Sequence, residues 1–456
     1  MNPPFPFEVI LMFAFLSTML LIGVLVRGKV KLVQKYLFPS SLIGGIVGLI
    51  IVNGKWFDID PKIFEAFAFH FFNISFISIG LTPTTAEEQL NKAESKDSIL
   101  GALWMALVQG VTFPIQAVIG GLFVILLGVF SYNLNDAFGF LLPLGFNEGP
   151  GEALSFGKVW ETMGFQNAAT VGISFATIGF LFAFFVGVPL VNWGIRKGLA
   201  KSGKDGELPQ EFLKGFYSKD KEESIKMKST MHPANVESLA FQFALVGLVY
   251  GVTYIFTILF AKVLPPDIGK MVWGFFFLFG MVFAILIRKV LSLFKVEHLL
   301  NVPLQRQITG FAVDYLIVAT GSAIQIAVVS QFLLPITLIS VTGGILTVFI
   351  ILYYGKRLQS YNMERIAAIF GTVTGTVSTG LLLLRIVDPE FKTPVAREIG
   401  YMNIFAVPVI GTLTFVINGT FWWHLSTLVM TLIFLGIAIL FVILIELFKL
   451  RKKPQF

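Results

Sequence analysis

The sequence predicts an all-α integral membrane protein, with about 11 transmembrane helices in two inverted-topology repeats that each contain a re-entrant hairpin. Three observations lead to this class. Of the 456 residues, 55% are hydrophobic and only 13% are charged, which is about half the charged share of a soluble domain. The apolar residues form runs of about 20, the length that crosses a bilayer. A polar segment then separates two halves of similar layout.

Composition also excludes several kinds of chemistry. The chain has no cysteine, so it has no disulfide, thiolate nucleophile or iron–sulfur cluster. Its four histidines lie far apart, which argues against a zinc site. No loop of the form G-x-x-x-x-G-K-[ST] indicates nucleotide binding. We therefore expect a protein that is not an enzyme, needs no cofactor, and draws on an ion gradient or works passively.

The predicted spans follow one another in two groups of five. They cover residues 7–26, 37–53, 63–81, 99–130 and 168–195, then 237–263, 268–291, 307–329, 332–355 and 400–418, with an eleventh at 421–448. Two Gly-rich stretches, 139–157 and 366–386, are too short and broken to cross. We predict re-entrant hairpins there, which are tolerated at membrane depth when buried in protein or lining a cavity.

This reading divides the chain into four parts. Residues 1–195 form a first repeat, 196–236 a cytoplasmic linker, 237–418 a second repeat, and 419–456 an extra transmembrane helix with a basic tail. With the N-terminus outside and the C-terminus in the cytoplasm, all but five of the 34 Lys and Arg residues lie on the cytoplasmic side. The exceptions are Lys55, Lys62, Lys158, Lys262 and Lys270. This bias favours a multi-pass protein of the inner (plasma) membrane in that orientation.

The two halves then enter the membrane from opposite sides, so their hairpins do too. Each hairpin is followed by a span with a proline-bearing kink, at 186–189 in the first half and at 405–408 in the second. Matched, inverted halves with interrupted segments are typical of secondary transporters, which bind their substrate near the midplane.

The first hairpin carries five candidate substrate-binding residues: Asn147, Glu148, Gly149, Gly151 and Glu152. The glycines allow a sharp turn that exposes backbone groups, and the N-terminus of a half-helix favours an anion such as a carboxylate. Two acids are costly at membrane depth unless paired or hydrated. They indicate cation coordination or proton exchange, or simply a hairpin tip that faces water.

The second hairpin concentrates hydroxyl groups and glycines between Gly371 and Gly380. Hydroxyl oxygens can bind Na⁺ or a substrate ammonium, and their protons can bind a carboxylate. Tight helix packing is the competing explanation. The candidates here are Thr374, Gly375, Thr376, Ser378, Thr379 and Arg385, the last as a partner for a carboxylate or as a cytoplasmic flank.

Polar residues also interrupt one span in each half. Asp314 lies in the apolar run 310–317, and Asn73 and Ser75 interrupt 71–76. An acid in mid-span is a candidate functional residue, although a structural pair with Arg306 or Thr320 is the alternative for Asp314. We predict Asn73, Ser75 and Asp314 as Na⁺ ligands.

These motifs together resemble the glutamate:sodium symporter family. The resemblance rests on Phe38-Pro39 with Gly44-Gly45, on 76–81, on Glu148-Gly149-Pro150-Gly151, on 375–380 and on 407–411. It implies two inverted five-helix repeats, two hairpins and a homodimer. The chain departs from the family pattern where Glu148 replaces a usual His, where Glu152 stands in place of a small residue, and where Thr372 replaces a frequent His.

We therefore expect a secondary active transporter that couples Na⁺ to glutamate, or to a related small amino acid or carboxylate, by alternating access. The lipid bilayer, Na⁺ and the small-molecule substrate are its expected partners, with no nucleic acid. The alternative is a passive cation channel or a cation/proton exchanger that uses the intramembrane carboxylates.

Overall fold

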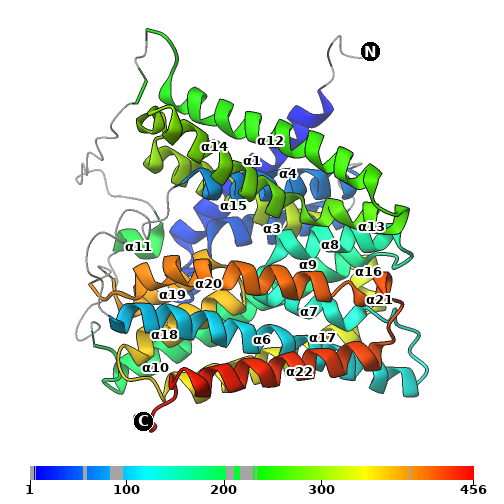
Figure 1. Cartoon of the computed structure of the whole chain (residues 1–456), viewed down its shortest axis with the longest axis vertical. Helices are drawn as coiled ribbons and strands as arrows, with labels where there is room; N and C mark the ends of the chain where they lie inside the picture. Colours follow the sequence, from blue (N-terminus) through cyan, green and yellow to red (C-terminus); the bar gives the residue numbers. More distant parts are fainter. Residues whose placement is uncertain are drawn as a thin grey trace. The chain divides into compact units, whose positions relative to one another are not determined.

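The computed structural model describes residues 5, 7–54, 59–82, 96–201, 210–215, 230–231, 234–389 and 392–455. Within these ranges all regular secondary structure is helical, which confirms the predicted all-α class (Figure 1). A helix satisfies its backbone hydrogen bonds within itself, which an apolar solvent requires, and within each unit described below long helices pack against one another.

Eight spans in the described part of the chain are long and apolar enough to cross a membrane. They are α1 (Glu8–Lys29), α4 (Lys62–Leu81), α6 (Lys96–Val129), the continuous run Ala168–Arg196, α12 (Ser238–Val263), the run Val272–Leu293, α17 (Leu333–Gly355) and α22 (Thr427–Leu447). A ninth is formed by α20 (Val395–Val416) if its two halves, bent by 51°, count as one span.

The other two of the eleven expected spans do not meet these limits. Residues 37–53 give α3 (Ser40–Asn53), which has only 14 residues. Residues 307–329 give α15 (Val302–Ala323) and the short α16 (Ile326–Gln331). Helix α15 is 22 residues long, but its polar residues, Arg306 and Asp314 among them, make it less apolar than the others. The count by length and composition is therefore eight or nine.

The chain forms two compact units, each assembled from both halves of the sequence. Unit 1 contains residues 1–83, 154–162 and 210–325, and unit 2 contains 84–153, 163–209 and 326–456. The two predicted halves thus each contribute to both units. Both predicted hairpin tips belong to unit 2.

Unit 1 is built around α15, which packs along α3 and α4, while α1 packs on α3 and α14 (Phe276–Leu293) packs on α4. Backbones touch where α3 crosses α15, because a Cβ on Gly321 would lie 2.6 Å from the Cα of Gly45. A buried polar chain joins three of its helices: Ser78 donates to Gln305 at 2.7 Å, and Gln305 donates to Gln242 at 3.1 Å. Close contacts between small residues and hydrogen bonds between polar side chains are two ways in which membrane helices associate.

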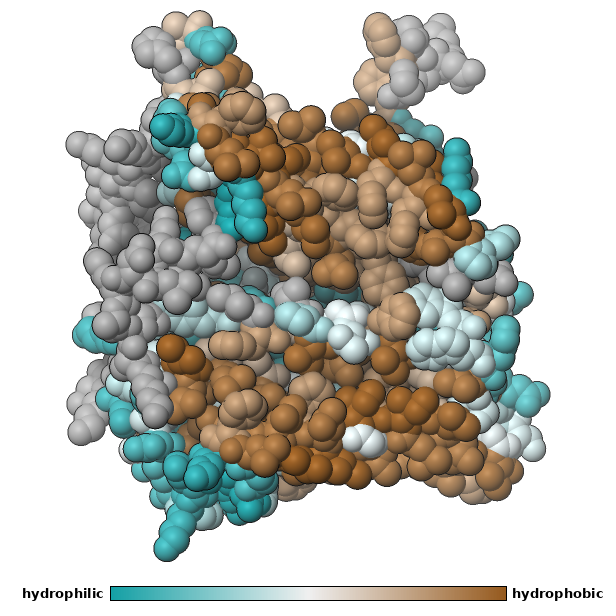
Figure 2. All heavy atoms as spheres, in the orientation of Figure 1, coloured by the Kyte–Doolittle hydropathy of each residue, from teal (hydrophilic) through white to brown (hydrophobic). Residues whose placement is uncertain are grey.

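Unit 2 is built around α6, against which α17, α20 and α22 pack. In Figure 1, α6 lies between α20 and α22. Figure 2 shows hydrophobic surface over α22 and hydrophilic residues gathered near the C-terminus. Leu428, Leu432 and Ile439 on α22 are each more than half exposed, as expected of side chains that face lipid.

Both proline-bearing spans are irregular at the predicted places. The run Ala168–Arg196 consists of α9 (Ala168–Phe182), the π-helical turn η3 (Ala183–Gly187) and α10 (Val188–Arg196), whose second residue is Pro189. Helix α20 bends ahead of Pro408. Proline removes one helical hydrogen bond and clashes with the preceding turn, so each irregularity has a local cause.

Candidate functional site

The first hairpin is a broken helix whose break is Gly149. A π-helical turn, η2 (Leu144–Glu148), ends there, and α8 (Pro150–Thr162) begins directly afterwards. Gly149 has φ +100°, a backbone conformation that favours glycine. Pro150 occupies the first position of α8, where its missing N–H costs nothing. The sequence Glu-Gly-Pro therefore ends one helix and starts the next within a single residue.

The second hairpin breaks at residues 374–376, between α18 (Asn362–Val373) and α19 (Val377–Val387). Its two arms fold back on each other, because a Cβ on Gly371 would lie 2.7 Å from the Cα of Gly380. Thr376 caps α19: its hydroxyl oxygen accepts from the Thr379 N–H at 3.4 Å. Helix packing thus explains why Gly371 and Gly380 are glycines, and capping of α19 explains the threonine at position 376.

The two breaks meet inside unit 2. A Cβ added to Gly149 would lie 3.0 Å from the carbonyl oxygen of Gly375 and 3.1 Å from Cγ2 of Thr376. Helices α8 and α19 both begin at this contact. The first N–H groups of a helix have no partner within it, and its N-terminus carries a partial positive charge. Two such ends close together form a place suited to an anion.

Two acids adjoin this meeting point. Glu152 is 4% exposed and lies in the first turn of α8, where the helix dipole offsets its negative charge. Glu148 ends the preceding π-helical turn and is partly exposed, with Nε2 of Gln109 3.5 Å from its Oε1. The neighbouring amide of Asn147 lies 3.0 Å from the hydroxyl of Thr112. The site thus combines positive helix ends with carboxylates.

A polar stripe on α6 faces both hairpins, and the sequence analysis did not identify it. Gln109 and Thr112 lie near the first hairpin, whereas Gln116 donates to the carbonyl of Val373 in the second at 3.3 Å. The three residues are buried. Their spacing, i, i+3 and i+7, places them on one face of the helix, and that periodicity in an otherwise apolar span is the signal that could have found them.

The remaining candidates of the second hairpin differ in accessibility. Thr374 is fully buried and its hydroxyl donates to the carbonyl of Phe370, one turn back, at 2.7 Å, so its proton is bound within the chain itself. Thr379 is 4% exposed, while Thr376 is partly exposed and Ser378 is exposed. Arg385 is exposed eight residues beyond the start of α19, roughly 12 Å along the helix axis. Ser378 and Thr376 are therefore the hydroxyls accessible at the tip.

The three predicted Na⁺ ligands lie in unit 1, on α4 and α15. Asn73 and Ser75 are buried and donate within α4, to the carbonyls of Phe69 and Phe72, both at 2.7 Å. Asp314 is exposed on α15. Among the described residues no hydrogen bond or ion pair joins Asp314 to the other two, and no group of three His, Cys, Asp or Glu residues could hold a metal ion.

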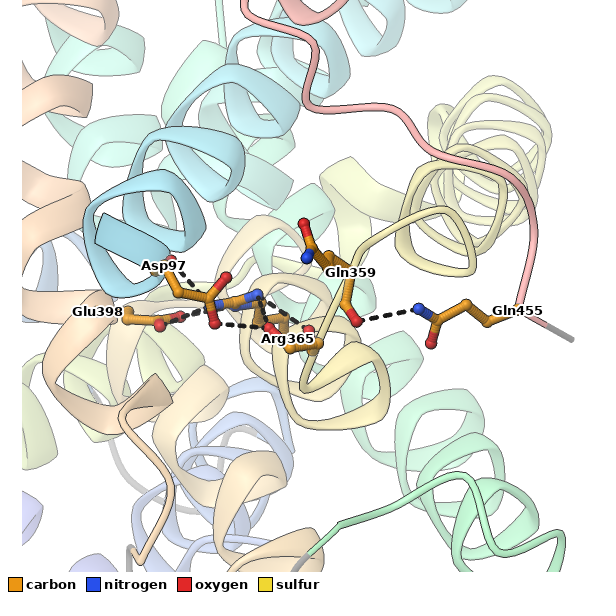
Figure 3. Close-up of polar contacts among 6 residues, drawn as sticks. Asp97, Gln359, Arg365, Glu398 and Gln455 are labelled. Atoms are coloured by element: carbon orange, nitrogen blue, oxygen red, sulfur yellow. Dashed lines mark hydrogen bonds and ion pairs between the residues drawn. The ribbon is translucent and has the colours of Figure 1, made fainter. Parts of the chain in front are cut away.

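A buried ion pair fixes α18, the arm that leads to the second break. The guanidinium of Arg365 contacts both carboxylate oxygens of Glu398, at 2.7 and 2.8 Å, and both side chains are at most 2% exposed (Figure 3). Arg365 also lies 3.7 Å from the Asp97 carboxylate, at the start of α6. Gln455, near the C-terminus, donates to the carbonyl of Gln359 at 3.0 Å. These contacts link α18 to α20 and α6.

Broken helices that meet inside a bundle of apolar helices define a class: multi-pass membrane transport proteins, in which irregular backbone at membrane depth lines a binding site. A family model described as sodium/glutamate symporter matches residues 5–381. The chain therefore belongs to the sodium/glutamate symporter family, and it is a transporter rather than an enzyme. The match ends within α19, so α20 and α22 lie beyond it. The comparison with curated proteins found no match.

Proposed function

We propose that the protein carries glutamate, or a closely related small amino acid or carboxylate, into the cell together with Na⁺ by alternating access. The observation that carries this proposal is the meeting of two helix N-termini at the hairpin tips, Gly149 against Gly375, in a chain of the sodium/glutamate symporter family. Positive helix ends favour the substrate carboxylates. The hydroxyls and carboxylates at the same tips are available to the other polar groups of the substrate.

Within this site we assign Glu148 to the substrate ammonium. Its side chain is partly exposed beside Gly149, whereas that of Glu152 is buried in the helix that follows. A carboxylate accepts from an ammonium through charge-assisted hydrogen bonds. The assignment accounts for an acid at a site that binds a dicarboxylate, since the ammonium of the amino acid compensates the added negative charge.

We further propose the inverted repeats, the homodimer and the orientation with the N-terminus outside. Contacts between helix ends support the predicted grouping of these ends on one side of the membrane or the other. Asn53 donates to Ile324 and Thr427 donates to Asp136, and all four lie at predicted outer ends. Arg365 and Asp97 lie at predicted inner ends. Labelling of single cysteines introduced at exposed Lys262 and Lys453, with an impermeant reagent on intact cells, tests the orientation: only the first is expected to react.

The decisive experiment is uptake of labelled glutamate into liposomes that contain the purified full chain, with and without an inward Na⁺ gradient. Accumulation that requires the gradient supports the symporter. The second candidate, a passive cation channel or cation/proton exchanger, is favoured by the paired acids Glu148 and Glu152. It predicts cation flux without substrate and no Na⁺-driven accumulation, and that result would reject the symporter.

The role of Glu148 has its own test. Loss of a charge-assisted hydrogen bond costs about 1.5–3 kcal/mol, so we expect Glu148→Gln to raise the KM for glutamate roughly 10- to 150-fold. Glutarate, which lacks the ammonium, should compete at least as well with the variant as with the wild type. Glu297→Gln, on an exposed segment of unit 1, is the matched control. Equal loss of glutamate and glutarate binding would refute the assignment.

A further inference from the structure

Three oxygen-bearing groups from three helices of unit 2 converge near the C-terminal end of α18. Nε2 of Gln116, on α6, lies 3.0 Å from the hydroxyl oxygen of Thr347, on α17, and 3.3 Å from the carbonyl oxygen of Val373, the last residue of α18. Gln116 is fully buried and Thr347 is 1% exposed. The convergence is therefore built into the interior of the unit.

The other end of the Gln116 amide is unsatisfied. Within the described residues, Oε1 of Gln116 is buried and has no hydrogen-bond partner, which is unfavourable for a polar atom. If the amide turned by 180°, Oε1 would face the oxygens of Thr347 and Val373. Three oxygens pointing at one another repel unless a cation lies among them. In the present orientation, the positive N–H groups of Gln116 point to the place among these oxygens that a cation would fill after the turn.

The backbone adds to this preference for a cation. The C-terminal end of a helix carries a partial negative charge, and α18 ends at Val373. The hydroxyl of Thr347 already donates to the carbonyl of Gly343 at 2.7 Å, so its lone pairs are directed away from that bond. Amide, hydroxyl and carbonyl oxygens are hard, neutral ligands, and carbonyls at half-helix ends suit Na⁺.

We propose that Gln116, Thr347 and the Val373 carbonyl form a Na⁺ site, in which Gln116 binds the ion after its amide turns. This inference rests on the proposed Na⁺ coupling and names the residues that hold the ion. It places the ion in the same unit as the hairpin tips. The earlier candidates Asn73, Ser75 and Asp314 lie in unit 1.

The test replaces the hydroxyl without changing the shape of the side chain. Thr347→Val should raise the Na⁺ concentration for half-maximal glutamate uptake about tenfold or more, with maximal uptake retained at saturating Na⁺. The matched control is Thr414→Val on α20, another buried threonine whose hydroxyl donates one turn back, to Ile410 at 2.9 Å. We expect the control to keep the wild-type Na⁺ dependence.

A second readout avoids transport altogether. Thermal unfolding of the full chain in detergent, in NaCl or in choline chloride, measures stabilisation by Na⁺ alone. We expect Thr347→Val and Gln116→Leu to lose the Na⁺-dependent shift, and Thr347→Ser and the control to retain it. Should Thr347→Val fail to fold, Gln116→Glu gives the opposite test, since its added charge should lower the half-maximal Na⁺ concentration.

Two negative outcomes have different meanings. A wild-type protein whose uptake and unfolding ignore Na⁺ overturns Na⁺ coupling and this site together. A Na⁺-dependent wild type whose dependence survives in Thr347→Val and Gln116→Leu overturns only this site and leaves the symporter standing.

Discussion

The buried ion pair of Arg365 and Glu398 gives the sharpest prediction about stability. Two parallel hydrogen bonds join the side chains, and the guanidinium also donates to the backbone carbonyls of Ser360 and Asp97, at 2.9 and 3.2 Å. Breaking a buried pair by removing one partner costs about 3–5 kcal/mol. We expect Arg365→Met to lie at the upper end, since it leaves two carbonyls without that donor, and Glu398→Leu at the lower end.

A double variant separates the interaction from the packing. Replacing both partners by apolar residues is often neutral, so Arg365→Met with Glu398→Leu should be less destabilised than either single variant. The assay is thermal unfolding of the full chain in detergent. Arg451 and Glu446 form the control pair: they lie 2.8 Å apart with side chains 41% and 42% exposed, and Arg451→Gln should cost about 1 kcal/mol or less. A melting temperature for Arg365→Met equal to that of the control would refute the reasoning.

The hairpin tips allow two further predictions. Gly149→Ala should abolish uptake, because the new Cβ meets the second hairpin 3.0 Å away. Gly164→Ala carries the same backbone strain, with φ +101° but nothing within 4 Å of the Cβ, and should keep most activity; equal loss in both would attribute the effect to strain. Ser378→Ala should raise the KM for glutamate about fivefold, the effect of one hydrogen bond, while Thr374→Ser leaves it unchanged. A larger rise in KM for Thr374→Ser than for Ser378→Ala would contradict the conclusion that Ser378, and not Thr374, is accessible to the substrate.

Local signals allowed much of this structure to be predicted. Gly149 and Pro150 define a helix break, and Pro189 and Pro408 lie beside helix irregularities. Glycine permits backbone angles that other residues avoid, and proline lacks the N–H that a helix needs, so both act locally. The all-α class followed from composition in the same way, since every apolar run had to form a helix.

Features that depend on packing were not predicted. Asp314 interrupts an apolar run, yet which way it faces depends on how α15 lies against α3 and α4, and it is exposed. Gln116 was overlooked because a few polar residues hardly change the average hydropathy of the 34-residue helix α6. Its partners, Thr347 and Val373, come from more than 200 positions away in the sequence.

The break at 374–376 places the end of one helix and the start of another a few residues apart. Val373 and Val377 are separated by four backbone steps, at most about 14 Å. A cation at the first and a carboxylate at the second attract each other by about 1.2 kcal/mol at an effective dielectric constant of 20. By thermodynamic reciprocity, each ligand must then tighten the binding of the other by the same factor, about sevenfold. One short interruption in a helix is thus enough to couple the binding of two solutes of opposite charge.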